Sequence, residues 1–340
     1  MDNATGATYG ADDAGLICGF ACRPGAAAKE IGSAEAAQWL ARPEKEGFLW
    51  LHFNLGHNAS ERWLRNTARL PEPFFETLKE GLHSTRIERD EDALVAVIND
   101  VHFDFSFEPS DISTLWISVQ PGLVVTARLR PLRSVDKLRA SMKAGEQLRS
   151  SAELLERLMR SQADVLVEIV RGVTARIDGI EDDLLAGKLH HKRVKLGALR
   201  RLLVRLQRLL APEPAALFRL LQYPPGWMAA MDVQELRQST EEFSVVLRDM
   251  ASLQERIKLL QEEIAAQVNE DNSKSLFVLT IVTVLALPIN IIAGLFGMNV
   301  GGIPLSQHAH GFWVVVGVIA LITGIAARFA FRAGRRDGDD

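Results

Sequence analysis

Two long apolar runs near the C-terminal end dominate the hydropathy pattern of the chain. They cover Leu276–Phe296 and Phe312–Phe331, and no Lys, Arg, Asp or Glu occurs from Ser275 to Ala327. Each run has about the twenty residues that an α-helix needs to cross the hydrocarbon core of a bilayer. A helix in a soluble protein would instead carry a polar face at 3.6-residue spacing. The pattern therefore predicts a membrane hairpin.

The charges that flank the two runs predict their orientation. The link between the runs contains no basic residue, whereas Lys274 precedes the first run and a cluster of arginines follows the second. Basic residues beside membrane spans stay in the cytoplasm. Both termini are therefore expected in the cytoplasm of a bacterium, with the spans in the inner membrane and the link on the far side. The arginine cluster consists of Arg328, Arg332, Arg335 and Arg336.

A long helical region is expected before the membrane hairpin. The segment Asp232–Glu235 has a capping-box pattern, and apolar residues then recur mostly every three or four positions, with no Pro or Gly until Pro288. One continuous helix is expected from about Val233 to about Phe296, roughly 95 Å long. Upstream of it, a basic amphipathic helix is expected over Val194–Leu210. Its arginines have two interpretations, pairing with acids of a facing helix, which we favour, or binding anionic lipid.

The N-terminal third mixes strand and helix signals. Strands are expected at Gly15–Arg23 and Phe48–Asn54, a helix broken by two prolines at Ser60–Gly81, and a hairpin from Leu115–Ser118 and Leu123–Arg128. The fold class is therefore an α+β membrane protein. The expected boundaries are 1–14 for a mobile tail, 15–133 for a cytoplasmic α/β domain, 134–231 for helical arms, 232–274 for a stalk helix, 275–297 for the first span, 298–310 for a periplasmic turn, 311–331 for the second span and 332–340 for a cytoplasmic tail.

The polar residues of the first span are not scattered. Thr280, Thr283, Asn290 and Gly294 recur with two leucines at steps of three and four, which places them on one stripe of a helix. An Asn that faced lipid would leave its amide unsatisfied. The stripe therefore faces either a neighbouring helix or a water-filled pore. The pore interpretation requires a homo-oligomer, because one chain with two spans cannot enclose a pore.

Composition excludes several other functions. The net charge of −4 gives no electrostatic case for nucleic acid binding. Cys18 and Cys22 lack the second pair of ligands that a structural zinc site needs, so both are expected to be reduced residues in or beside a strand. We find no nucleophile–base pairing or phosphate-binding loop, and we expect neither an enzyme nor a bound cofactor. Four histidines lie on separate elements, and each is expected to be a core or surface residue and not a metal ligand. They are His52, His57, His83 and His102.

The end of the first span carries a family resemblance. The stretch GLFGMNVGG, with Gly297-Met298-Asn299 at the end of the first of two C-terminal spans, resembles the signature of the CorA family of divalent-cation channels and transporters. The longer run LPINIIAGLFGMNVGGIPL is most similar to the zinc-transporting ZntB branch. The resemblance covers essentially the whole chain. It implies a funnel-shaped homopentamer in which five copies of the first span line the pore, with Asn299 at its outer mouth. The expected pore-lining residues are Asn299, Met298, Gly297, Gly294, Asn290, Leu287, Thr283, Thr280 and Leu276.

A pore of this kind contains no carboxylate in the membrane. A bare divalent cation in a low dielectric meets a very large desolvation penalty, so the ion is expected to keep much of its water shell. Asn299 and Asn290 are the best candidates for acting on that shell, followed by the two threonines. Below the membrane, acidic collars are expected to attract cations, although a solvated stalk face explains the same residues. The acids are Glu262, Glu263, Glu270 and Asp271, and a basic collar is expected from Arg332, Arg335 and Arg336.

The outer turn departs from the magnesium channels of the family. Those typically carry acids after the signature, whereas VGGIPLSQHAHG has none. This favours zinc as the transported ion, with Co²⁺, Ni²⁺, Cd²⁺ and Mg²⁺ as other candidates and H⁺ as a candidate coupling ion. His308 and His310 are candidate zinc ligands, although a plain interfacial loop is the favoured interpretation. The alternatives are a magnesium, cobalt or nickel channel driven by membrane potential, and a two-span signalling or scaffold protein.

Overall fold

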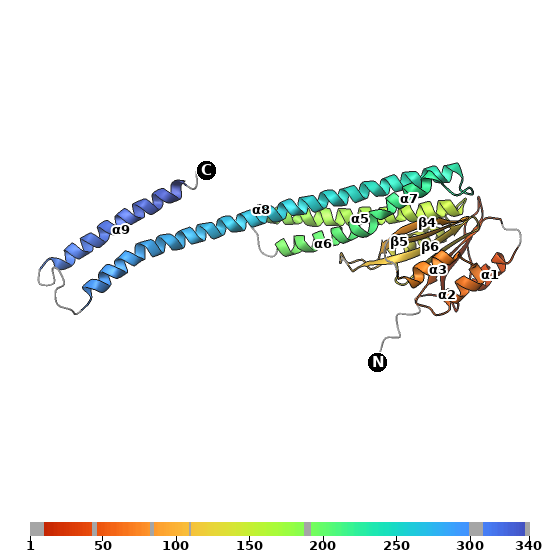
Figure 1. Cartoon of the computed structure of the whole chain (residues 1–340), viewed down its shortest axis with the longest axis horizontal. Coiled ribbons are helices and arrows are strands. Elements are labelled where there is room, and N and C mark those ends of the chain that lie inside the picture. Colours follow the sequence, from red (N-terminus) through yellow and green to blue (C-terminus); the bar gives the residue numbers. More distant parts are fainter. Residues whose placement is uncertain are drawn as a thin grey trace, which may run out of the picture. The chain divides into compact units, whose positions relative to one another are not determined.

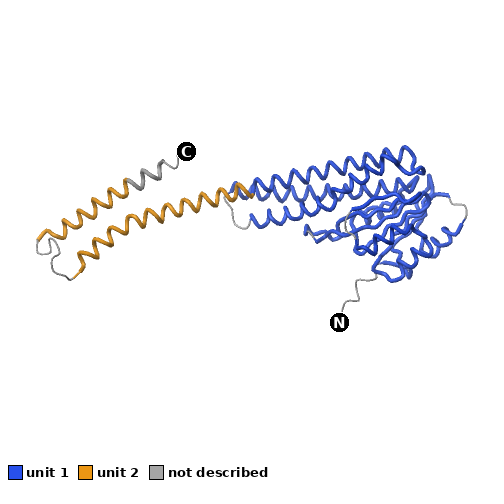
Figure 2. The backbone as a smooth tube through the Cα atoms, in the orientation of Figure 1, with its two compact units in different colours: residues 1–260 blue, residues 261–340 orange. Residues whose placement is uncertain are grey.

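The chain mixes strands and helices up to Arg128 and is helical beyond it, as Figure 1 shows for the computed structural model. The structure describes residues 10–42, 46–81, 85–108, 110–186, 192–298 and 309–336, with side chains as far as residue 328. The chain forms two compact units, Met1–Leu260 and Gln261–Asp340 (Figure 2), which we call unit 1 and unit 2.

The described residues form strands and helices with the following bounds. The strands are β1 (Leu16–Cys22), β2 (Lys29–Glu30), β3 (Phe48–Asn54), β4 (Arg86–Asp90), β5 (Ala93–Val101), β6 (Ile112–Gln120) and β7 (Leu123–Arg128). The helices are α1 (Ser33–Leu40), α2 (Ser60–Trp63), the π-helical η1 (Leu64–Ala68), α3 (Glu72–Lys79), α4 (Arg133–Lys143), α5 (Ser151–Leu185), α6 (Lys192–Leu210), α7 (Pro212–Gln222), α8 (Ala230–Phe296) and α9 (Gly311–Arg336).

Among the described residues, the strands form one mixed seven-stranded sheet in the order β2-β1-β3-β7-β6-β5-β4. The pair β3–β7 is parallel and the other neighbours are antiparallel. Successive side chains of a strand point to opposite faces. Phe48 and Trp50 therefore join a core with α4, α5 and α7, whereas Leu49 and Leu51 join a core with α1 and α3. Cover on both faces explains why β3 is buried throughout and mostly apolar.

Several expected elements are confirmed. β3 and β7 have the predicted bounds, and the helix expected at Ser60–Gly81 is broken between Ala68 and Glu72. Pro71 lies in this break and Pro73 in the first turn of α3. The sequence analysis missed β4, because its sequence RIERD is charged and largely exposed. Backbone pairing with β5 places it in the sheet. Asp12, inside the predicted tail, accepts hydrogen bonds from the backbone N–H groups of Ala14 and Leu16 at 3.0 Å.

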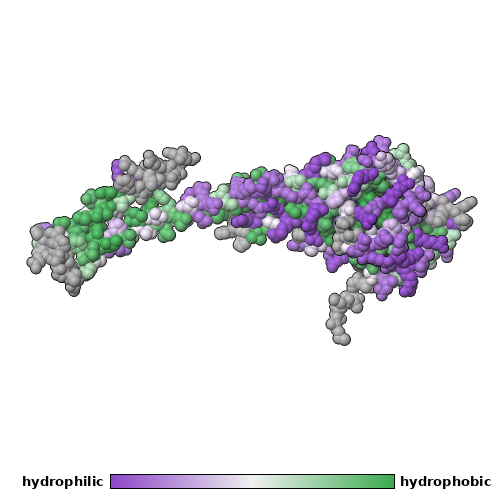
Figure 3. Space-filling view, viewed as in Figure 1, coloured by the Kyte–Doolittle hydropathy of each residue, from purple (hydrophilic) through white to green (hydrophobic). Residues whose placement is uncertain are grey.

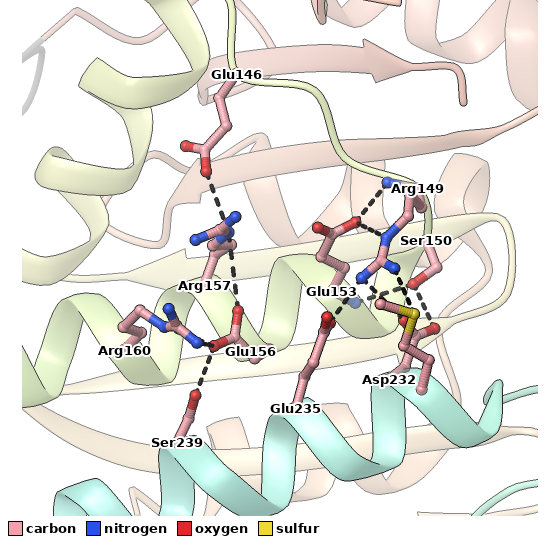
Figure 4. A network of polar contacts seen from close by, with 11 residues as sticks. Glu146, Arg149, Ser150, Glu153, Glu156, Arg157, Arg160, Asp232, Glu235 and Ser239 are labelled. Carbon is pink, nitrogen blue, oxygen red and sulfur yellow. Dashed lines mark hydrogen bonds and ion pairs between the residues drawn. The ribbon is translucent and has the colours of Figure 1, made fainter. Parts of the chain in front are cut away.

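The long C-terminal helix is confirmed, but the expected role of Asp232 is wrong. α8 begins at Ala230, so Asp232 lies inside its first turn instead of capping it. The Asp232 carboxylate accepts a hydrogen bond from Ser150 Oγ at 2.7 Å, and Ser150 in turn caps α5 by accepting from the Glu153 backbone N–H at 3.0 Å. Arg149 Nη2 lies 2.6 Å from Glu235 Oε2. Figure 4 shows that these contacts join the first turns of α5 and α8.

A second group of contacts joins the same two helices. Glu156 on α5 is buried, and its carboxylate accepts from Ser239 Oγ of α8 at 2.5 Å and pairs with Arg160 at 2.6 Å (Figure 4). A buried carboxylate requires this compensation, because losing its partners would leave a charge in the core. The polar network therefore fixes the register between α5 and the part of α8 that lies in unit 1.

The favoured interpretation of the basic helix is wrong for three of its arginines. Arg201, Arg205 and Arg208 on α6 are exposed, and none has an ion pair within the described part of the chain. Two acids of α5, Asp178 and Glu181, pair with Arg256 of α8. At the start of α6, Lys192 pairs with Asp183.

Two carboxylates lie in the core where β5 meets α4, α5 and α7. Glu213 is fully buried and accepts from Gln162 Nε2 at 3.2 Å, and the same amide donates to the Asn99 carbonyl at 2.7 Å. Asp100 accepts from the Ser134 backbone N–H at 3.1 Å, which satisfies a donor in the first turn of α4. Burial raises the pKa of Glu213 to about 8 and the pKa of Asp100 to about 6.

These raised pKa values predict that stability falls as the pH rises toward about 8. The folded state holds the Glu213 proton more tightly than the unfolded chain does, where the pKa is near 4.5. Its contribution is full below that value and is lost as pH rises through about 8. The Asp100 contribution is already lost above about 6. Between pH 6 and 8, the free energy of unfolding should therefore fall by an amount on the order of 1 kcal/mol per pH unit.

Glu213→Gln is the matched test of this prediction, because an amide keeps the shape but cannot ionise. The unfolding midpoint of the full chain in detergent, followed by fluorescence between pH 6 and 8, should become nearly independent of pH in this variant. Equal pH slopes for the variant and the original chain would show that Glu213 is not the titrating group.

Candidate ion-conduction site

The C-terminal third of α8 and most of α9 form an apolar surface that lacks cover within the chain. In the described part of the chain, these two helices are long and apolar enough to cross a membrane, and no residue in the most apolar window of α8 is buried. Leu276 is 64% exposed and Phe312 is 72% exposed. Figure 3 shows hydrophobic residues gathered over this part of unit 2. Lipid or other protein copies must cover this surface, because burial of apolar area drives such helices out of water.

The predicted polar stripe lies on α8 as expected. Its described members recur every three or four residues and are all exposed, which places them on one face of the helix. These members are Leu276, Thr280, Thr283, Leu287, Asn290 and Gly294. Among them, Asn290 carries the only side-chain amide. A Cβ added at Gly294 would meet no atom within 4 Å, so this position leaves open space beside the helix.

The threonine hydroxyls of the stripe are arranged to present oxygen. Thr280 Oγ1 donates to the Leu276 carbonyl at 2.8 Å, and Thr283 Oγ1 donates to the Leu279 carbonyl at 2.8 Å. Each hydroxyl hydrogen is therefore used within the helix, and the oxygen lone pairs remain as acceptors. Such oxygens suit a hydrated cation, whose water molecules donate hydrogen bonds outward.

Pro288 adds a further acceptor to the same helix. It lies inside α8 and has no N–H, so it cannot donate to the carbonyl of Val284. The hydroxyls of Thr280 and Thr283 do not bind this carbonyl, because they donate to the Leu276 and Leu279 carbonyls. The Val284 carbonyl is therefore a second kind of oxygen in the span.

The outer end of the first span is only partly described. Gly297 and Met298 follow the end of α8, and Met298 is 51% exposed. Asn299 and His308 lie outside the described residues. His310 is exposed, and its carbonyl accepts from the Val314 backbone N–H at 3.2 Å in the first turn of α9.

The predicted acidic collars lie on the part of α8 that precedes the first span. Glu262, Glu270 and Asp271 are exposed. Glu270 Oε1 lies 2.7 Å from Lys274 Nζ, and this ammonium lowers the pKa of Glu270. The charge of Glu270 is therefore partly neutralised within one chain. The predicted basic collar falls in the last turns of α9, where the side chains of Arg332, Arg335 and Arg336 lie outside those described.

The cysteines and histidines of unit 1 do not converge. Among the described residues, no group of three or more His, Cys, Asp or Glu could hold a metal ion. Cys18 and Cys22 are free and buried, and burial raises the pKa of each thiol to about 12. His52 is a satisfied core residue, because its Nε2 accepts from Arg128 Nε at 2.9 Å and its Nδ1 contacts Thr126 Oγ1 at 2.8 Å. His83 lies outside the described residues.

The sequence analysis missed two sites in unit 1. One is the buried pair of Glu213 and Asp100, and the other is a hollow beside His102 and Arg139. Each combines residues that are distant in sequence and carry no shared motif. A charged residue inside an apolar run, such as Asp100 at the end of β5, is the one signal that the sequence offered.

Comparison with known proteins identifies the family. Residues 45–332 match the family described as "CorA-like Mg2+ transporter protein". The divalent cation transporter CmaX of Pseudomonas aeruginosa is 28% identical over 330 residues, which cover 96% of this chain and 97% of CmaX. The zinc transport protein ZntB of Yersinia enterocolitica is 26% identical over 278 residues, which cover 82% of this chain and 85% of ZntB.

Solved structures support the same assignment. The full-length CmaX structure has a TM-score of 0.78 and covers 96% of this chain and 98% of its own. The CorA magnesium transporter of Methanocaldococcus jannaschii shares the fold, with a TM-score of 0.74 at 19% identity, and covers 92% of this chain and 96% of its own. The family match spans both units, including the two apolar helices. This chain therefore belongs to the CorA-like Mg2+ transporter protein family and is a membrane-embedded divalent cation transporter, not an enzyme.

Proposed function

We propose that this chain transports Zn²⁺ as a hydrated ion through a pore formed by identical copies of α8. The observation that carries the proposal is the stripe of oxygen-bearing and small residues from Leu276 to Gly294 on a helix that is otherwise apolar. Lipid offers these oxygens no donor, whereas water and hydrated ions do. The same stripe is where Thr280 and Thr283 direct their hydroxyl hydrogens to their own helix.

The pore requires several copies of the chain, because α8 and α9 alone cannot enclose a channel. We propose a homopentamer, which the CorA resemblance implies. Five copies of α8 would turn each polar position into a ring of five oxygens or amides. Asn299 would form the outer ring and Asn290 a ring within the membrane. A neutral dipole acts weakly alone, but a ring of them acts on one ion together.

The ion keeps most of its water shell in this proposal. The described stripe contains no carboxylate that could replace the shell of a divalent cation, and stripping the shell without replacement carries a prohibitive cost. Glu262 and Asp271 would raise the local cation concentration by Coulomb attraction. Glu270 would contribute less, because Lys274 pairs with it. Arg332, Arg335 and Arg336 would form a basic collar that opposes free passage.

The choice of zinc over magnesium has two supports. The outer turn VGGIPLSQHAHG lacks acids and contains His308 and His310, and imidazole is a better ligand for Zn²⁺ than for Mg²⁺. ZntB relatives also match most of the chain. Mg²⁺ is the second candidate, because the matched family is described by that ion. A histidine side chain can also carry a proton, which suits coupling of uptake to an inward proton gradient.

Ion flux into liposomes tests this proposal. The full-length protein should carry Zn²⁺ faster than Mg²⁺, and an inward proton gradient should accelerate Zn²⁺ uptake. Asn299→Ala should abolish most of this flux because it removes the outer ring of amides. Asn272→Ala is the matched control, since Asn272 is an exposed residue of α8 that lies before the span.

The alternatives give different results in the same assay. Mg²⁺ flux driven by membrane potential alone would favour the magnesium-channel function. Absence of flux for either ion would contradict transport of both and favour a membrane-anchored scaffold. Uptake whose pH dependence is unchanged when His308 and His310 are both replaced by Ala would contradict their role in proton coupling.

We also propose that both termini are cytoplasmic, in the inner membrane, because basic residues flank the spans on that side. Ser306→Cys in the turn should react with an impermeant maleimide in intact spheroplasts, and Gly338→Cys near the C-terminus should react only after permeabilisation. The native Cys18 and Cys22 are buried and hold their protons, so they give little background. The reverse labelling pattern would show the opposite orientation.

A further inference from the structure

One face of α8 points away from the other helices of unit 1. The side of α8 that meets α5 and α6 (Figure 1) is buried at every seventh residue from Leu236 to Ile264. Positions two and five residues after each of these lie on the opposite side, about 200° and about 140° around the helix. All such positions from Gln238 to Asn269 are exposed, and we call them the open face. Its central part consists of Val245, Arg248, Ser252, Glu255, Leu259 and Glu262.

The open face keeps a seven-residue repeat that continues along α8 into the polar stripe. Steps of seven from Leu259 reach Thr280, and steps of seven from Arg248 reach Leu276. A strict repeat of seven stays on one side when identical helices supercoil around a common axis. If the stripe lines a pore, the open face therefore borders the water on the same axis. This inference rests on the proposed function, in which copies of α8 surround that pore.

Arg248 is the one basic residue in this repeat. From Gln238 to Gly294, all of which are described, no other open-face or stripe position carries Lys or Arg. Arg248 is exposed and has no ion pair among the described residues. The residues three and four positions away, which are its neighbours on the helix surface, are uncharged. They are Ser244, Val245, Ala251 and Ser252.

The acids of the open face lie two turns or more from Arg248. Glu241 precedes it by seven residues and Glu255 follows it by seven, and Glu255 pairs with Lys258 at 3.2 Å. Asp249 is the next residue in the chain, but it lies about 100° around the helix from Arg248. The positive charge of Arg248 is therefore not paired on its own face.

We propose that Arg248 forms a ring of guanidinium groups in the water-filled space between copies of α8 in unit 1, and that this ring slows the passage of divalent cations. A guanidinium stays charged at every physiological pH. Five like charges at one level add to a positive potential, and a divalent cation feels twice the repulsion of a monovalent one. Glu241 and Glu262 attract cations on either side, so Arg248 separates two attractive levels. This position makes it a rate-setting residue.

Charged thiol reagents measure the potential at the ring. Ser252→Cys places a thiol one turn from Arg248 in the full-length protein, and the native Cys18 and Cys22 are buried. We compare the reaction rates of a negatively and a positively charged methanethiosulfonate, relative to the same rates for a free thiol. At low ionic strength the ratio should be at least about ten, because five guanidinium groups surround the thiol. A lone arginine on a solvated helix gives a ratio of only about two.

Arg248→Gln in the same cysteine variant should bring the ratio to about one, because it removes the ring. Arg201→Gln is the matched control, since Arg201 is an exposed arginine of α6 that has no ion pair within the described ranges. It removes the same charge and should leave the ratio at Ser252→Cys unchanged. A ratio of about two before either substitution, or an equal fall in both variants, would overturn the ring.

Zn²⁺ uptake into liposomes tests the barrier. Arg248→Gln should raise the initial rate at least about threefold at low ionic strength, and the gain should shrink as salt is added, because salt screens the ring. Arg201→Gln should leave the rate unchanged. Equal rates for Arg248→Gln and the original chain would overturn the barrier.

The two assays separate this proposal from the proposed function. Absence of flux, or flux that survives Asn299→Ala, would contradict the pore. The reagent ratio at Ser252→Cys requires no flux and still decides whether the ring exists. Flux that Asn299→Ala abolishes, together with a reagent ratio of about two, would leave the pore in place and remove only the ring.

Discussion

The apolar surface of the two C-terminal helices is the constraint on which the rest of the structure depends. The described part of the chain does not cover this surface, since no residue in the most apolar window of α8 is buried. The hydrophobic effect therefore places these helices in a bilayer. A bilayer then imposes its own condition, because each polar group inside it needs a partner. Within one chain, the polar stripe of α8 meets this condition only in part. We therefore propose that identical copies of the chain assemble around it.

Unit 1 differs from the two apolar helices, because its own helices cover both faces of its sheet. Its buried charges are compensated by other side chains of the same unit. Glu156 is stabilised by Ser239 and Arg160, and Asp232 by Ser150. These contacts join α5 to the part of α8 that lies in unit 1 and give that helix a fixed register there. One helix thus belongs to two environments with different physical demands.

The sequence predicted those features that repeat locally. The two spans, the long helix up to Phe296 and strand β3 follow from apolar periodicity and from the absence of Pro and Gly. The sequence did not predict β4, because an exposed charged strand has no apolar pattern of its own. The role of Asp232 was also missed, since its partner Ser150 lies far away in the chain.

The candidate ion-conduction site shows the same difference between features that repeat locally and features that depend on atomic positions. The spacing of Thr280, Thr283 and Asn290 predicted a shared helix face, and the structure has it. The direction of the threonine hydroxyls became visible only with atomic positions. Glu213 and Asp100 come together in the core through the packing of α7 and α4 against the sheet, which no local pattern encodes.

The most direct test of the central claim is the water accessibility of α8 in the assembled membrane protein. Single cysteines at each stripe position from Leu276 to Gly294 would be treated with a small hydrophilic thiol reagent, beside Val278→Cys, Leu285→Cys and Ile289→Cys on the opposite face. A water-filled pore predicts reaction at the stripe positions and protection of the other three. Protection of all positions, or equal reaction of both faces, would contradict a pore lined by this stripe.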